Sequence, residues 1–199
     1  MNTFSIATWN VNSLRVRLPQ LAEWLTAVQP DIVALQETKL PDADFPAAEI
    51  QALGYQVTYS GQRTYNGVAV LSRTPLTPIA TDIPGFVDEQ RRVLAVETQG
   101  CIVVDLYVPN GQEPGSDKYA YKLRWLEALR GWLVELHKLG RPLIVLGDFN
   151  IAPEDRDVHD PIAWQGSVHV SEPERHAFAR LLETGLVDVF RRFEQAPQT

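Results

Sequence analysis

The 199-residue sequence predicts an α/β protein in which β-sheets carry helices on their outer faces. Three observations lead to this class. Short apolar strand-like segments dominate the chain, and a small number of helical segments interrupt them. A long segment around residue 130 places apolar residues at helical spacing. No linker-like stretch divides the sequence, and its length suits one well-buried domain, so we expect a single domain over residues 1–199.

The first quarter of the chain alternates strands and helices. Residues 4–10 read as a strand with a polar end, and residues 17–29 place leucines on one helical face before a terminating proline. Residues 31–37 form a second buried strand. Residues 45–54 are typical of a short helix closed by a glycine C-cap.

The middle of the chain is rich in strands separated by turn residues. Four are expected, in the segments "YQVTYS", "GVAVLSR", "RVLAVET" and "CIVVDLYV". A long helix follows over residues 119–140. Its apolar stripe consists of Trp125, Leu126, Leu129, Trp132, Leu133 and Leu136.

The last part contains one more strand and one more helix. Residues 142–150, "PLIVLGDFN", read as a buried strand. Residues 151–170 carry few periodic signals and are expected to form a long loop. Ser171 and Glu174 have capping-box spacing at the start of a helix that Gly185 closes.

The composition narrows the function classes. A net charge of −7 argues against nonspecific binding of nucleic acid over the whole protein surface. The same net charge is compatible with a local basic rim beside an acidic metal site. Cys101 is the single cysteine and lies in an apolar run, which predicts a buried thiol and a reducing compartment. The sequence shows no signal peptide and no apolar run of about 20 residues. We therefore expect a cytoplasmic protein without a membrane segment.

Three predicted strands end in polar side chains that suit a hard cation. Asn10 ends the first strand, Glu37 the second and Asp148 a later one, with Asn12 and Asn150 close behind. Carboxylate and amide oxygens are the ligands that Mg²⁺ prefers. Each residue alone is better explained as a turn cap. The joint pattern favours a metal site.

Other polar residues have weaker signals. Tyr107 and Asn110 follow an apolar strand, and Asn66 precedes a glycine, which is first a turn signal. Basic residues occur in pairs that normally form a solvated face but could hold phosphates around an acidic rim. These pairs are Arg15 and Arg17, Arg91 and Arg92, and Lys118 and Lys122. The four histidines lack metal-binding spacing, and neither a Ser-His-Asp triad nor a P-loop is supported.

Several motifs, taken in order, resemble one known family. They are "ATWNVNSLRVRLPQL", "DIVALQETKL", "TYNGVAVLSR", "QRRVLAVE", "LYVPNG" and "VLGDFNIAPEDRDV". This ordered set is similar to exonuclease III-type apurinic/apyrimidinic endonucleases of the endonuclease/exonuclease/phosphatase superfamily. The similarity extends over essentially the whole chain.

The resemblance implies a four-layer αββα sandwich of two packed mixed sheets. It also implies Mg²⁺- or Mn²⁺-dependent hydrolysis of double-stranded DNA at abasic sites and 3′ ends. Glu37 and Asn10 would form the metal site, with Asn10 supporting Glu37 or touching the phosphate, and Asp148 would orient or deprotonate the attacking water. Asn150 would hold the phosphate and the water in line, and Tyr107 would donate a hydrogen bond to the scissile phosphate. The expected substrate-binding residues are Asn12, Asn66, Arg91, Asn110 and Lys118.

The sequence departs from the family pattern at its end. Family members continue with three further motifs that carry an acid, an Asp–His pair and strands of the second sheet. We therefore expect the second sheet to be incomplete, in a fragment of a longer enzyme or in a naturally short homologue. Two alternatives stay open: a catalytically inactive DNA-binding module, and a superfamily phosphatase or RNA nuclease. The sequence does not predict an oligomeric state.

Overall fold

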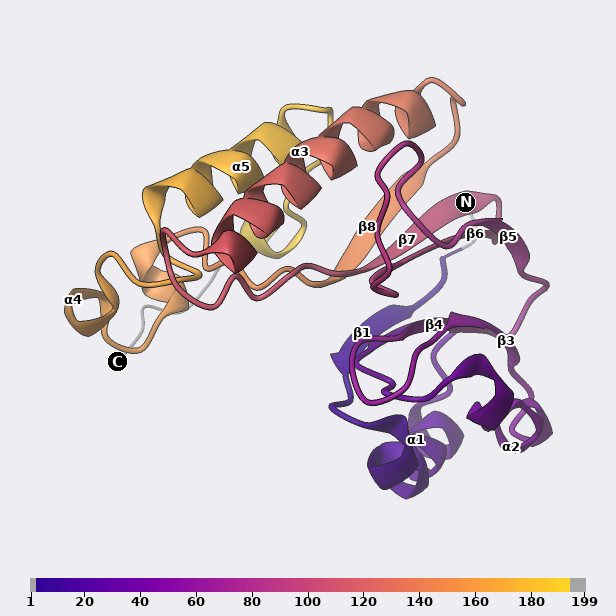
Figure 1. The fold of residues 1–199 in the computed structure, drawn as a ribbon. Coiled ribbons are helices and arrows are strands. Elements are labelled where there is room, and N and C mark those ends of the chain that lie inside the picture. Colours follow the sequence, from indigo (N-terminus) through magenta and orange to yellow (C-terminus); the bar gives the residue numbers. More distant parts are fainter. Residues whose placement is uncertain (1–2, 194–199) are drawn as a thin grey trace. The chain divides into compact units, whose positions relative to one another are not determined.

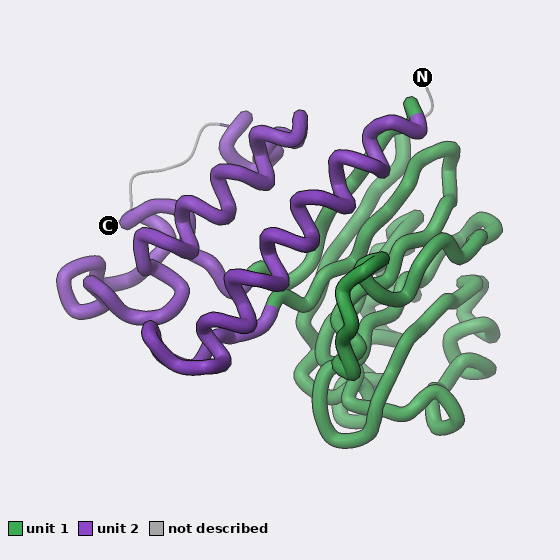
Figure 2. Tube along the Cα trace, turned by 45° about the horizontal axis from the view of Figure 1, so that its top comes forward, with its two compact units in different colours: residues 1–108, 140–149 green, residues 109–139, 150–199 purple. Residues whose placement is uncertain are grey.

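The computed structural model describes residues 3–193 and divides them into two compact units (Figure 2). The first unit contains the residues up to Val108 together with Gly140–Phe149. The second contains Pro109–Leu139 and the residues from Asn150 onward. The expectation of a single domain stays a prediction.

The described elements match most of the predicted ones (Figure 1). The strands are β1 (Ile6–Asn10), β2 (Ile32–Gln36), β3 (Gln56–Ser60), β4 (Val68–Ser72), β5 (Thr77–Ala80), β6 (Val93–Thr98), β7 (Cys101–Tyr107) and β8 (Leu143–Asp148). The α-helices are α1 (Leu14–Val28), α2 (Ala47–Ala52), α3 (Asp117–His137), α4 (Pro161–Trp164) and α5 (Glu172–Leu182). Short 3₁₀ turns occupy Asp42–Asp44, Asp155–Asp157 and Phe190–Arg192.

The first unit contains two four-stranded mixed sheets. In one sheet the strand order is β1-β2-β4-β3, with β1 and β2 parallel and the other neighbours antiparallel. In the other sheet the order is β5-β6-β7-β8, with β7 and β8 parallel. The predicted α/β class with two mixed sheets is confirmed.

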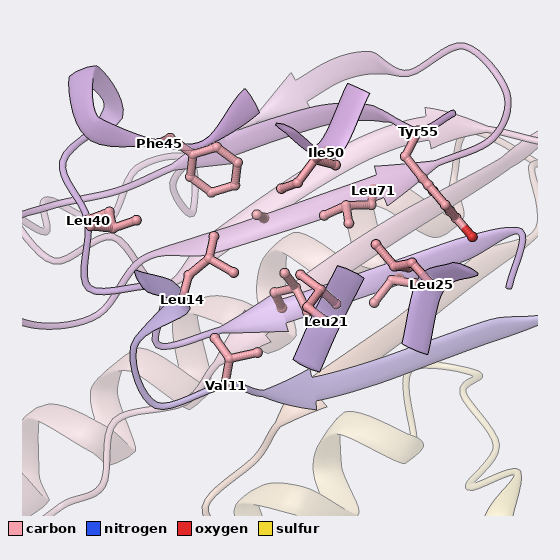
Figure 3. Close-up of a cluster of buried hydrophobic side chains, with 12 residues drawn as sticks. Val11, Leu14, Leu21, Leu25, Leu40, Phe45, Ile50, Tyr55 and Leu71 are labelled. Atoms are coloured by element: carbon pink, nitrogen blue, oxygen red, sulfur yellow. The ribbon is translucent and has the colours of Figure 1, made fainter. Parts of the chain in front are cut away.

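Apolar side chains fill both faces of the first sheet. Its inner face packs against the second sheet through Ile32, Val68, Val70, Leu94, Val96 and Val103. Its outer face is covered by α1 and α2, whose Leu21, Leu25 and Ile50 are buried in a second cluster (Figure 3). Strands β2 and β4 are therefore buried along their whole length, which explains why the first four residues of each are apolar.

Two strands differ from the sequence-based expectation. Strand β5 was not predicted, because Pro78 and its exposed neighbours hide the strand pattern; it lies at a sheet edge and carries a bulge, as proline requires. Strand β8 was predicted to be buried, but all six of its residues are half-buried. Among the described strands β8 is also an edge strand, so its second side lacks a neighbouring strand.

In the second unit α3 and α5 lie side by side (Figure 1). The predicted stripe of α3 is buried, and Ser116 caps this helix by accepting a bond from the Tyr119 backbone N–H at 3.1 Å. The segment expected to be a long loop contains α4. The first unit contains both sheets and the helices α1 and α2. The second unit contains α3 and α5. Among residues 3–193 no helix has the length and apolar character needed to cross a bilayer.

Gly147 lets β8 approach β7 closely, and this gives a testable prediction. Its φ is +136°, and an added Cβ would lie 2.0 Å from the carbonyl oxygen of Leu106. Backbone must move to relieve such a contact, so we expect Gly147→Ala to lower the free energy of unfolding by more than about 2 kcal/mol. Urea unfolding measures the change. The control is Gly131→Ala in α3, where a Cβ meets open space and stability should rise by up to about 1 kcal/mol. Equal stabilities for both variants would contradict this reading.

Candidate active site at the strand ends

The polar residues that end three strands meet in the first unit. The side-chain nitrogen of Asn10 donates to Glu37 Oε1 and to Asp148 Oδ2, at 2.8 Å in each case. Asn10 ends β1, Glu37 follows β2 and Asp148 ends β8, so the amide joins the ends of strands from both sheets. We call Asn10, Glu37, Asp148 and Tyr107 the strand-end cluster.

The amide of Asn10 has a defined orientation. Its Oδ1 accepts the backbone N–H of Asn12 at 3.0 Å, which directs the nitrogen toward the two carboxylates. An amide held in this way lies between the two negatively charged side chains and donates to both. The expectation that Asn10 contributes to a metal site stays a prediction, because its Oδ1 keeps a second lone pair beside the bond from Asn12.

Glu37 is stabilised in its charged form. Burial raises the pKa of this carboxyl, but hydrogen bonds from Asn10, Lys39 and Tyr107 outweigh burial and hold the pKa below its usual value. Lys39 Nζ lies 2.8 Å from Glu37 Oε2 and also contacts the side chain of Asn12. Sequence reasoning missed Lys39, although its place two residues after Glu37 was a usable signal.

The backbone around Glu37 is strained and firmly held. Glu37 has φ +53°, a left-handed conformation that costs a non-glycine residue about 1–3 kcal/mol. The loop after β1 donates backbone bonds to the end of β2, from Val11 N to Gln36 O at 3.0 Å, and to the loop after β2, from Ser13 N to Glu37 O at 2.8 Å. Thr38 N donates to Gly67 O at 3.1 Å. These bonds fix the direction of the carboxylate before any ligand arrives.

Tyr107 ends β7 and supplies a phenol that stays protonated. Burial and the negative charge of Glu37 raise the pKa of Tyr107 to about 12. The guanidinium of Arg92 lies 4.6 Å from the centre of the tyrosine ring. The hydroxyl is therefore a hydrogen-bond donor throughout the neutral pH range.

A buried polar pair lies between the sheets behind Glu37. Gln36 Nε2 donates to Asp105 Oδ1 at 2.6 Å, and the same amide nitrogen donates to Thr8 Oγ1 at 3.0 Å. Asp105 is completely buried, and this burial raises its pKa well above the usual value. Sequence reasoning missed the pair; the signal was an acid inside the apolar run of β7.

The predicted substrate-binding residues fall into different environments. Asn66 is buried, and its amide donates to Gln62 at 3.1 Å. Arg91 makes an ion pair with Asp82, in which one guanidinium nitrogen donates to both carboxylate oxygens at 3.0 and 3.1 Å. Asn12 is exposed beside Lys39.

The remaining predicted residues belong to the second unit. Asn110 contacts His169 Nε2 at 3.0 Å through its side-chain nitrogen, a partner that sequence reasoning missed. Lys118 is exposed in the first turn of α3. Asn150 is half-buried and follows Asp148 by two residues in the chain.

The cluster chemistry suits a divalent cation that keeps several waters. Within residues 3–193, groups of three or more His, Cys, Asp or Glu side chains able to hold a metal do not occur. Mg²⁺ differs from metals bound by such groups, because it is held by one or two carboxylates and retains water ligands. Glu37 and Asp148, bridged by one amide, match that requirement.

Two four-stranded mixed sheets with a carboxylate and amide cluster at their strand ends define an α/β protein of the exonuclease and AP endonuclease class. The chain belongs to the Endonuclease/Exonuclease/phosphatase family, whose model matches residues 7–189. The match includes residues of both compact units. The predicted resemblance is confirmed.

Relatives and solved structures agree with this assignment. The chain is 35% identical over 191 residues to an exodeoxyribonuclease of Bacillus subtilis, covering 94% of this chain and 74% of that protein. The structure of a 3′ phosphatase, NExo, from Neisseria bound to a product DNA hairpin is similar with a TM-score of 0.92 and 43% identity. An AP endonuclease from Archaeoglobus fulgidus is similar with a TM-score of 0.92 and 37% identity. Both structural comparisons cover 96% of this chain and 74% of the other.

Proposed function

We propose that this protein is a DNA-repair phosphodiesterase that hydrolyses DNA at abasic sites and 3′ ends with a divalent metal ion. The observation that carries the proposal is the Asn10 amide bridging Glu37 and Asp148 at 2.8 Å each. The names of the related exodeoxyribonuclease, 3′ phosphatase and AP endonuclease support the DNA substrate.

Phosphodiester hydrolysis needs an activated water and neutralisation of charge on the phosphate oxygens. A bound Mg²⁺ or Mn²⁺ would supply Lewis-acid stabilisation of that charge. Glu37 would hold the ion, and Asn10 would keep Glu37 and the neighbouring Asp148 in place. We infer that Mg²⁺ is preferred, because the cluster offers hard oxygen donors.

The side chains divide the remaining work. Asp148 orients the attacking water and accepts its proton. The Tyr107 hydroxyl, whose single proton bonds Glu37 without substrate, turns to donate to a phosphate oxygen as charge develops. Removal of such a donor typically costs about 3–4 kcal/mol of barrier. Asn150 holds the phosphate in line with the water. Arg91 and Lys118 bind flanking phosphates, with Asn12, Asn66 and Asn110 supporting the loops that contact DNA.

Metal removal provides the direct test. We expect the protein to nick a duplex that carries one abasic analogue when Mg²⁺ is present, and EDTA to reduce the rate by at least about 10³-fold, because the phosphate charge then lacks its counter-ion. Denaturing electrophoresis of an end-labelled strand measures the product. A matched duplex without the lesion is the control.

Other outcomes identify the alternatives. DNA that is retarded but uncut would indicate a binding module without catalysis. Cutting of single-stranded RNA at a rate above that of the abasic duplex would indicate an RNA nuclease. Release of inorganic phosphate from a 3′-phosphorylated end would indicate a second activity of the same centre, which the related 3′ phosphatase favours.

A further inference from the structure

Lys122 is a fully buried lysine in the second unit. The sequence suggested a solvated or phosphate-binding residue, which is wrong, because the side chain has no exposed surface. Its Nζ donates to the carbonyl oxygens of Asn110, at 3.1 Å, and Asn150, at 2.6 Å. The same nitrogen makes an ion pair with Glu174 of α5. One ammonium therefore ties a helix to two loops.

Both carboxylate oxygens of Glu174, the ion-pair partner of Lys122, have hydrogen-bond partners. The second oxygen of Glu174 accepts the backbone N–H of Ser171 at 3.3 Å and the hydroxyl of the same serine. That hydroxyl also bonds to Tyr119 on α3. A buried ion pair is weak evidence for a gain in stability, because desolvation of both charges offsets their attraction. A gain in stability therefore does not explain why Lys122 and Glu174 are buried as a pair.

The two carbonyl groups belong to backbone in unusual conformations. Asn150 has φ +49°, a left-handed conformation for a non-glycine residue. Gly111 and Gln112, directly after Asn110, have φ +93° and +60°. Such conformations persist where surrounding contacts over-determine them. Lys122 provides a charged donor to each loop, and charge-assisted bonds are about twice as strong as neutral ones.

We propose that Lys122 is a positioning residue that fixes the loops of Asn110 and Asn150 for phosphodiester hydrolysis. Glu174 keeps the lysine charged and aimed at the two carbonyls. The inference rests on the proposed function, because it gives Asn150 a role at the phosphate. It adds a residue that contacts neither substrate nor metal but sets the rate through the backbone it holds.

The test compares a double variant, with one substitution in α3 and one in α5, with a control variant at the end of α3. Lys122→Met alone would leave Glu174 as an unpaired buried charge and could unfold the protein. The double variant Lys122→Met/Glu174→Gln removes both charges, while the new amide keeps an oxygen for Ser171. Lys138→Met is the control, because Lys138 lies in the exposed C-cap of α3 and pairs with Glu135 at the surface.

We expect the double variant to fold with a thermal midpoint near that of the wild type but to lose at least 30-fold in kcat, with KM changed less than threefold. Hydrogen exchange should accelerate at least tenfold at the backbone amides of Gln112 and Ala152. These amides are now bonded to Asn110 Oδ1, at 3.0 Å, and to His169 O, at 2.8 Å. The control should match the wild type in every measurement.

A double variant with kcat within threefold of the wild type and unchanged exchange would overturn the proposal. If that variant does not fold, Lys122→Arg replaces it: the ion pair stays, but a planar guanidinium cannot send three donors from one atom. Full kcat and unchanged exchange in Lys122→Arg would equally overturn the proposal. Hydrogen exchange reports on the loops without any need for activity. If the wild type does not incise DNA, but exchange at Gln112 and Ala152 still accelerates in the double variant, the proposed function is contradicted and the loop-holding part of the inference is not.

Discussion

Replacement of Asp148 by Asn is expected to lower kcat for abasic-site incision by about 10³-fold, because the amide cannot accept a proton from water. The substituted side chain keeps an oxygen for Asn10, which now donates to Asp148 at 2.8 Å. The backbone bond from Val108 N to Asp148 O, at 2.9 Å, is unaffected. Thermal unfolding should therefore shift by only a few degrees, and single-turnover incision should report a loss of chemistry rather than of fold.

The control for this substitution is Asp31→Asn. Asp31 lies before β2 and accepts bonds from the backbone and hydroxyl of Ser5, at 2.7 and 2.9 Å. It is thus a hydrogen-bonded carboxylate of the same unit at the opposite end of its strand. Asp31→Asn should leave incision within twofold of the wild type. Comparable losses from both substitutions would show that Asp148 acts through stability.

Sequence reasoning could locate the strand-end cluster because periodicity and topology are coupled. Polar residues directly after apolar strands predict side chains at the sheet edge, and parallel neighbours bring their ends together. Asn10 and Glu37 satisfy this rule at the ends of the parallel strands β1 and β2, whereas Asp148 ends β8 in the other sheet. The structure joins all three side chains. The pattern says nothing about which atom of Asn10 faces the carboxylates, since that depends on the bond from Asn12.

Residues whose roles depend on buried contacts with distant parts of the chain were harder to predict. Lys122 has the sequence context of a surface lysine, and its role depends on Glu174, which lies 52 residues away in the chain. Asp105 occupies an apolar strand and finds Gln36 across the two sheets. Local propensity carries no information on such long-range pairs. Strand β5 was missed for a different reason, because an exposed edge strand with a proline lacks an alternating apolar face.

Glu37→Gln is expected to lower the affinity for the metal ion, whereas the residue that accepts the proton from water stays in place. The substitution deletes one negative charge, while its oxygen still accepts from Asn10, which now bonds Glu37 Oε1 at 2.8 Å. Cation affinity depends on the number of charged ligands, so the Mg²⁺ concentration for half-maximal incision should rise on the order of 100-fold. Lys39 also loses its ion-pair partner, which leaves a positive charge beside the cation and strengthens the effect.

The metal titration separates the two carboxylates. High Mg²⁺ should restore a large part of the activity of Glu37→Gln but should leave Asp148→Asn inactive, because added metal cannot replace a proton acceptor. Glu23→Gln on the exposed surface of α1 is the control and should follow the wild-type titration. An unchanged half-maximal concentration in Glu37→Gln would mean that the cation binds elsewhere. Identical titrations for Glu37→Gln and Asp148→Asn would mean that the carboxylates share one role, and the division of labour proposed for the strand-end cluster would be wrong.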